Sequence, residues 1–154
     1  MIDRIIDRIK RECILLYYRQ RLRHIGKEVN ISSKVKIYDP ENVSIGDNVT
    51  INDRVIIQSC NGGTIDIGNN VTISYDAMII TGRFMLDGQG NLIKDHFSGN
   101  IIIEDNVWIC AGAIILSGVT IKKGSIIGAG AIVSSDIPEY SYVYSPRTKI
   151  IKIK

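Results

Sequence analysis

The stretch that decides the fold spans residues 103–133 and reads IEDNVWICAGAIILSGVTIKKGSIIGAGAIV. From Ile103 to Val133 an isoleucine or valine recurs at every sixth position, and a small or β-branched residue stands four positions after each of them. A fixed short period of this kind is the sequence signature of repeat architectures. The stretch therefore predicts a solenoid of stacked coils.

The same period extends back to Ile25 with three interruptions. The regular positions form five triplets, which are Ile25, Ile31, Ile37; Ile45, Ile51, Ile57; Ile67, Ile73, Ile79; Ile103, Ile109, Ile115; and Ile121, Ile127, Val133. Each interruption follows the third member of a triplet. If three hexapeptides make one turn of a triangular coil, every insertion then leaves from the same corner, as a stacked solenoid requires. We expect an all-β solenoid of about five parallel coils over residues 25–138, with Gly, Asn and Asp at the turns.

Composition fits one folded domain. The chain has 154 residues, of which 45% are hydrophobic and 23% charged, and these values exclude wholesale disorder. Only 6% are aromatic, which favours stacked β-branched layers over an aromatic core. No apolar run reaches the roughly 20 residues that cross a bilayer. The three cysteines form no even framework of disulfides and share no metal-ligand spacing. We therefore expect the reducing setting of the cytoplasm.

Basic charge is concentrated near the N-terminus. The net charge is +3, yet residues 1–27 alone hold eight Lys or Arg against three Asp or Glu. The remainder is slightly acidic, which gives no argument for nucleic-acid binding. Residues 1–24 predict an amphipathic helix, because apolar side chains follow i, i+3, i+4, i+7 spacing from Ile2 to Leu16. This helix either caps the open first coil or makes a weak contact with a membrane surface or a partner.

The repeat resembles that of the hexapeptide-repeat acyltransferases, whose coils form a left-handed parallel β-helix. Segments such as IGDNVT, IGNNVT and IGAGAI carry the resemblance. It implies that residues 139–154 form a C-terminal cap and tail. The closing motifs of the family are similar to Ser134–Pro138 and Ser145–Arg147 in this chain.

Two further features narrow the resemblance. A long insertion, residues 82–100, lies between the third and fourth triplets, and an excursion of this length is more often functional than decorative. The returning segment, IEDNVWIC, is similar to one in galactoside, maltose and capsular-sugar acetyltransferases. The resemblance implies a homotrimer that uses acetyl-CoA and acetylates a hydroxyl or amine of a sugar or similar small acceptor, with a place in polysaccharide biosynthesis.

The resemblance also implies residues for acetyl-CoA, which lies between two subunits in the family. By position, the contacts with the pantetheine arm fall on Ala111, Gly112, Ala129 and Ser134. Arg147 or Lys149 would lie near the 3′-phosphate, which needs a cationic donor. Plain coil packing explains the small residues equally well, and a solvated tail explains the basic ones.

The catalytic histidine of the family is missing from its usual position, where Arg83 stands instead. Arginine stays protonated near neutral pH and is no general base. His96 is the one histidine of the insertion and becomes the candidate base. Asp95 is a candidate to orient its ring, and Asp87 is another candidate for this orienting role. A second departure is Cys110, which stands where the family has glycine.

Two other functions compete with acetyl transfer. A γ-type carbonic anhydrase uses the same solenoid with zinc held by three histidines, whereas this chain has only His24 and His96, so we expect no metal site. A degenerate family member that binds a ligand or partner without turnover would explain the missing histidine. Binding of CoA without acetylation of any acceptor would favour this last function.

Overall fold

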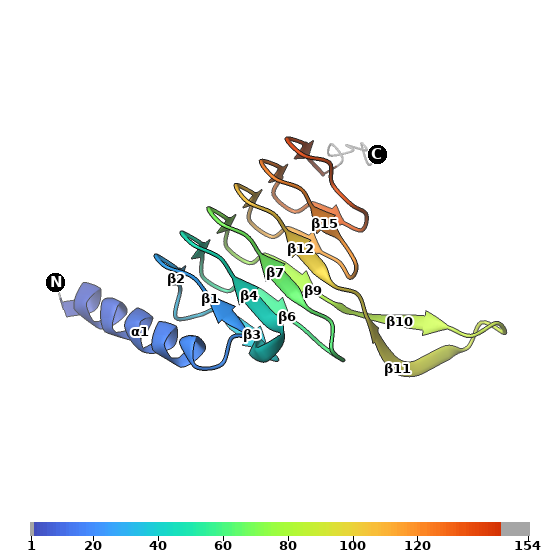
Figure 1. Ribbon diagram of the computed structural model, residues 1–154, viewed down its shortest axis with the longest axis horizontal. Helices are drawn as coiled ribbons and strands as arrows, with labels where there is room; N and C mark the ends of the chain where they lie inside the picture. Colours follow the sequence, from blue (N-terminus) through green and yellow to red (C-terminus); the bar gives the residue numbers. More distant parts are fainter. Residues whose placement is uncertain (1, 146–154) are drawn as a thin grey trace, which may run out of the picture.

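The computed structural model describes residues 2–145, with side chains described outside residues 1–5, 7 and 94–97. The chain winds into stacked coils whose short strands form three parallel sheets (Figure 1). Sheet A contains β1 (His24–Ile25), β4 (Val43–Ile45), β7 (Ile65–Ile67), β12 (Ile101–Ile103) and β15 (Thr120–Ile121). Sheet B contains β2 (Asn30–Ile31), β5 (Thr50–Ile51), β8 (Thr72–Ile73), β13 (Trp108–Ile109), β16 (Ile126–Ile127) and β18 (Tyr142–Val143). Sheet C contains β3 (Lys36–Tyr38), β6 (Ile56–Gln58), β9 (Met78–Ile80), β14 (Ile114–Ile115) and β17 (Ile132–Val133).

The strand register confirms the hexapeptide repeat. In sheet B, Ile51 lies opposite Ile73, and Ile73 opposite Ile109. Every regular position except Ile25 in the first coil is buried. Each buried isoleucine contributes roughly 1.5–3 kcal/mol relative to an exposed one. The stack of inward isoleucines is therefore the main source of stability.

The corners between sheets A and B show why glycine and short polar residues recur there. A Cβ atom on Gly46 would lie 2.8 Å from the backbone of Gly68 in the next coil, so this position needs glycine. The backbone N–H of Asp47 donates to Asn69 Oδ1 (2.8 Å), and that of Asn69 donates to Asp105 Oδ1 (2.6 Å). These side chains satisfy backbone groups that the strands leave unpaired.

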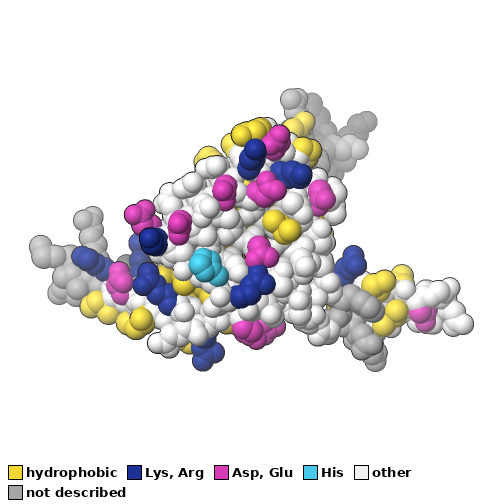
Figure 2. Space-filling view, viewed as in Figure 1, with side chains coloured by type: hydrophobic (Ala, Val, Ile, Leu, Met, Phe, Trp, Pro, Cys, Tyr) yellow, Lys and Arg dark blue, Asp and Glu magenta, His cyan; other side chains and the backbone are white. Residues whose placement is uncertain are grey.

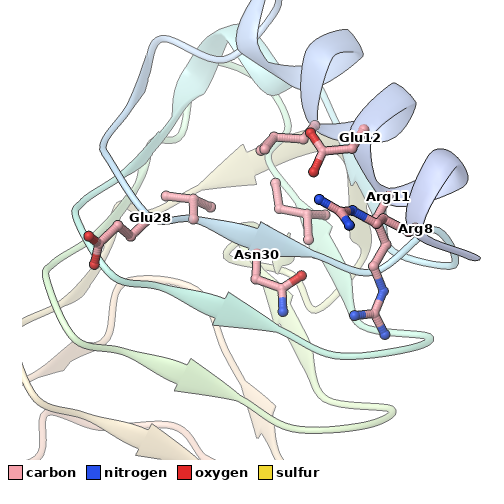
Figure 3. A pocket seen from close by; sticks show the side chains of 8 residues that line it. Arg8, Arg11, Glu12, Glu28 and Asn30 are labelled. Carbon is pink, nitrogen blue, oxygen red and sulfur yellow. The ribbon is translucent and has the colours of Figure 1, made fainter. Parts of the chain in front are cut away.

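Helix α1 (Ile2–Arg19) covers the start of the solenoid and ends before the expected residue 24. Its last turn is anchored by Tyr18, which is buried. The Tyr18 hydroxyl donates to the carbonyl of Val35 and accepts from the N–H of Ile37 (3.1 Å). A cavity of about 620 Å³ lies between α1 and β2. Figure 3 shows Arg8, Arg11 and Glu12 on its helix side. The C-terminal part of the helix thus packs on the first coil.

The insertion at residues 82–100 is an ordered hairpin and not an irregular loop. Strands β10 (Gly82–Leu86) and β11 (Leu92–Ser98) pair antiparallel and project from the solenoid as a long arm (Figure 1). The hairpin was not predicted, because the turn at residues 87–91 contains Asp-Gly-Gln-Gly and not a typical two-residue loop.

The solenoid also continues beyond residue 138, where we expected the repeat to end. Ile137 forms a parallel bridge with Ile121, and β18 extends sheet B beside β16. The buried Ser125 hydroxyl fixes this last turn, because it donates to the carbonyl of Pro138 (2.8 Å) and accepts from the N–H of Ser141 (3.2 Å). The described closing segment is therefore a further partial coil.

Candidate active site

Small residues line one corner of the last coils, between sheets B and C. Ala111 and Ala129 are exposed and lie in successive coils, since the N–H of Gly130 donates to the carbonyl of Ala111 (2.9 Å). The N–H of Gly112 donates to the carbonyl of Tyr75 in the preceding coil (2.9 Å). Within residues 2–145, the N–H groups of Ala111 and Ala129 donate to no acceptor. The corner thus offers two unpaired donors beside small side chains, an arrangement that fits the amide carbonyls of a pantetheine arm.

The two residues that precede these alanines shape the same corner. A Cβ atom on Gly128 would lie 2.7 Å from the carbonyl oxygen of Val143, so the closing coil requires glycine there. Cys110 is half-buried, and burial raises the pKa of its thiol. The Cys110 side chain is therefore a neutral, weakly polar group at neutral pH.

The base of the arm holds the second group of candidates. Arg83 on β10 lies opposite Phe97 on β11, and the register shifts between Arg83 and Met85, which pairs with Ile93. The backbone of Asp95 and His96 falls within this irregular segment, and their side chains lie outside the described residues. Bulges are common next to active sites, where they redirect a side chain. His96 thus belongs to the same end of the arm as Arg83.

Asp87 lies at the far end of the arm, where its carboxylate holds the turn. Asp87 Oδ1 accepts from the N–H groups of Gln89 (2.8 Å) and Asn91 (2.9 Å), and Oδ2 accepts from the Asn91 amide (3.1 Å). The hydrogen bonds from Asn91 and Gln89 lower the pKa of Asp87. The structure thus places Asp87 at the opposite end of the arm from Arg83.

We expect the turn of the arm to loosen in acid. The pKa of Asp87 is lower in the folded hairpin than in the unfolded chain, so its stabilisation is complete above the unfolded pKa. This stabilisation is lost as the pH falls through the lower, folded pKa. Amide hydrogen exchange at Gln89 and Asn91 is measured by NMR across this pH range. As the pH falls, exchange should become faster than the intrinsic pH dependence of amide exchange predicts. Asp87→Asn should abolish the excess, and equal behaviour of the two proteins would contradict this role.

The two groups of candidates lie at opposite edges of sheet C. Ala111 precedes β14 and Ala129 precedes β17, whereas the arm begins where β9 ends. Ser134 follows β17 and lies at the arm side, away from the two alanines. Arg147 and Lys149 are outside the described residues. One chain therefore separates its candidate pantetheine corner from its candidate base by the width of a sheet.

The structure also reveals a pocket that we did not predict from sequence. A cavity of about 340 Å³ at the base of the arm is lined by Gln58, Cys60, Asn61, Ile80, Gly82, Arg83 and Phe84. The signal for it was the second interruption of the repeat, after Ile57, which leaves from the same corner as the arm. The two insertions lie side by side because the intervening coil is a single turn.

Other expectations concern metals and membranes. His24 lies exposed on β1 in sheet A. Among the residues with described side chains, no group of three His, Cys, Asp or Glu is placed to hold a metal ion. No helix in residues 2–145 combines the length and apolar character of a bilayer span.

Comparisons with known proteins identify the family. Residues 100–135 match the family described as Bacterial transferase hexapeptide (six repeats). A solved maltose O-acetyltransferase from Clostridium difficile 630 is 30% identical, with a TM-score of 0.71 over 89% of this chain and 73% of that chain. The chain belongs to the hexapeptide-repeat acyltransferase family. The left-handed β-helix of that family is the fold of its solved relatives.

Two more relatives of this hexapeptide-repeat protein are informative. A hexapeptide-repeat acetyltransferase from Vibrio cholerae, solved in complex with acetyl coenzyme A, is 27% identical, with a TM-score of 0.76 over 83% of this chain and 69% of that chain. The galactoside O-acetyltransferase of Escherichia coli K12 is 34% identical over 115 residues, which are 75% of this chain and 46% of that protein. The chain spans about half the length of the curated relatives it matches.

Proposed function

We propose that the chain is an acetyl-CoA-dependent acetyltransferase that acetylates a hydroxyl or amine of a sugar or similar small acceptor. The observation that carries this proposal is the corner at Ala111 and Ala129, where two backbone donors lack acceptors among the described residues. The likeness to acetyltransferases of galactosides and maltose supports the acceptor class. Because acetyl-CoA is a cytoplasmic metabolite, we place the reaction in the cytoplasm. From the likeness to sugar acetyltransferases we assign the reaction to polysaccharide biosynthesis.

In this proposal acetyl-CoA supplies the acyl group and the chain supplies position and a base. The N–H groups of Ala111 and Ala129 hold the pantetheine arm, and Gly112 borders it. Arg147 or Lys149 binds the 3′-phosphate. His96 takes the proton of the acceptor hydroxyl as its oxygen attacks the acetyl carbonyl, and Asp95 orients the imidazole. The C–S bond of the thioester then breaks, and the CoA sulfur takes this proton from the imidazolium and leaves as the thiol.

The separation of corner and arm within one chain supports a site shared between subunits. The outward row of sheet C begins with Lys36 and continues with four apolar side chains in register, Ile56, Met78, Ile114 and Ile132. The outward row of sheet A, by contrast, contains His24, Ser44, Asp66, Ile102 and Thr120. A continuous apolar face of this kind marks an association surface. We propose that sheet C packs against neighbouring copies in a homotrimer, so that the corner of one copy meets the arm of the next.

Substitution of Ile132 by aspartate should dissociate this trimer. The Ile132 side chain is 65% exposed in the single chain, so a carboxylate there leaves the coil intact but opposes burial against a second copy. Light scattering should show the mass of three chains for the unmodified protein and that of one chain for Ile132→Asp. Ile102→Asp, on the outward face of sheet A, is the matched control and should remain trimeric. A monomeric unmodified protein at micromolar concentration would overturn the assembly.

We propose that helix α1 additionally makes a weak contact with an anionic membrane surface. Its outer stripe exposes Ile9 (58%) and Leu16 (62%), and hydrophobic side chains gather along this helix in Figure 2. Lys10 is exposed beside the stripe, and a basic residue beside an apolar face suits anionic lipids. The double variant Ile9→Asp/Leu16→Asp should lose sedimentation with phosphatidylglycerol vesicles. Equal sedimentation with neutral phosphatidylcholine vesicles would count against a contact through charge.

Thiol release from acetyl-CoA, followed with a panel of sugars and amino sugars, tests the proposed function. We expect release that depends on an acceptor, with a matching acetylated product in the mass spectrum. A degenerate protein, the alternative that the missing family histidine suggests, would bind CoA and acetylate nothing across the panel.

A further inference from the structure

The pocket at the base of the arm has a rigid floor. The carbonyl of Gln58 accepts from the N–H of the buried Thr81 (3.0 Å), whose hydroxyl oxygen accepts from the N–H of Cys60 (2.9 Å). The neighbouring Ser59 is also buried, and its hydroxyl donates to the carbonyl of Gly63 (2.6 Å). These bonds tie the short insertion after β6 to the start of the arm.

Gly82 is required for this floor. A Cβ atom on Gly82 would lie 2.6 Å from Cys60 Sγ, so any side chain there would displace the thiol. The Cys60 sulfur therefore occupies the space under the first residue of β10. The pocket is thus formed by close packing between two insertions and not by a gap between loosely placed segments.

The charge of the pocket comes from Arg83. Among the described lining residues Arg83 is the only charged side chain, and the amide of Gln58 and the exposed ring of Phe84 line the same pocket. Two other arginines are paired with carboxylates of the coils, Arg23 with Asp66 and Arg54 with Asp76. Arg83 forms no ion pair with any carboxylate in the described part of the chain. The guanidinium thus retains its donors for a ligand.

We propose that this pocket binds the anionic group of an acidic sugar, a carboxylate or a phosphate, with Arg83 as its cation. A guanidinium presents a planar fork of N–H donors that matches two oxygens of such a group. Gln58 adds an amide donor, and Ile80 with Phe84 offers an apolar wall to the carbon skeleton. The volume of about 340 Å³ is at the lower end of small-molecule sites, which suits a single sugar unit. Only the identification of this ligand as the acceptor rests on the proposed acetyl transfer.

The test compares three probes of the same sugar: galactose, galacturonate and galactose 1-phosphate. Binding to the full chain with CoA present is measured by NMR titration, for the unmodified protein and for Arg83→Gln. We expect at least one anionic probe to bind more tightly than galactose, and Arg83→Gln to weaken that binding roughly 10- to 100-fold. Arg83→Lys should restore part of the affinity. Lys122→Gln removes an equal charge at a different corner and should change nothing.

The outcomes separate the two proposals. Anionic binding that depends on Arg83, without turnover of any probe, would leave the pocket established and overturn the proposed acetyl transfer. Acetylation of neutral galactose that is unchanged in Arg83→Gln, with no preference for either anion, would overturn the pocket and leave the transfer standing. A preference for galacturonate over the phosphate, or the reverse, identifies which anion the pocket accepts. Equal binding of all three probes would contradict the inference.

Discussion

Replacement of Ile103 by aspartate is expected to unfold the protein. The Ile103 side chain is 1% exposed and stacks on Ile67 and Ile121 in the neighbouring coils. Aspartate would place an unpaired carboxylate in this dry stack and remove contacts on both sides, with a loss of roughly 4–5 kcal/mol or more. Typical domains are stable by about 5–15 kcal/mol in total. Chemical denaturation followed by circular dichroism should therefore show little or no native baseline.

The adjacent residue provides a matched control. Ile102 lies on the same strand and is 41% exposed, because successive side chains point to opposite faces. Ile102→Asp introduces the same carboxylate and should retain a cooperative transition close to that of the unmodified protein. Similar destabilisation by the two substitutions would show that the inward register is misassigned.

Removal of the His96 imidazole is expected to abolish most of the activity. In the proposed mechanism this ring takes the proton of the attacking acceptor, and loss of a general base lowers turnover roughly 10²–10⁴-fold. His96→Ala should leave CoA affinity and the thermal midpoint nearly unchanged, because the arm projects from the coils that form the core (Figure 1). Steady-state thiol release, with CoA binding measured alongside, checks this expectation.

His24→Ala is the control for this substitution. His24 lies on β1 in sheet A, at the first coil, and its loss should leave turnover intact. Full activity of His96→Ala would place the base on another residue. Binding of CoA without turnover in the unmodified protein would instead mean that Arg83, at the position of the family histidine, marks a loss of catalysis.

The coils could be predicted from the sequence because one physical constraint repeats in each of them. A position such as Ile73 must be apolar since it contacts its equivalents above and below, and the six-residue step records that contact directly. The three interruptions likewise predicted a common corner, because only there does an extra segment leave the stacking intact. The coils from β1 to β17 follow this scheme, and the partial coil that ends with β18 adds to it.

The site was harder to predict because its residues share no period. The hairpin depends on side chains such as Asp87, whose hydrogen bonds form only once the turn is closed. The Arg83 pocket combines residues from two insertions, and its floor rests on a contact between Cys60 and Gly82 that spacing does not encode. The small residues at Ala111 and Ala129 were predicted only through the resemblance, since coil packing favours the same residue types.

The position of bound CoA tests the central claim most directly. A crystal structure of the protein with CoA should show the pantetheine amides accepting hydrogen bonds from the N–H groups of Ala111 and Ala129. Its sulfur should point toward the base of the arm of a neighbouring copy, near His96. CoA bound elsewhere on the coils, or a sulfur enclosed by one chain alone and remote from any arm, would contradict the account.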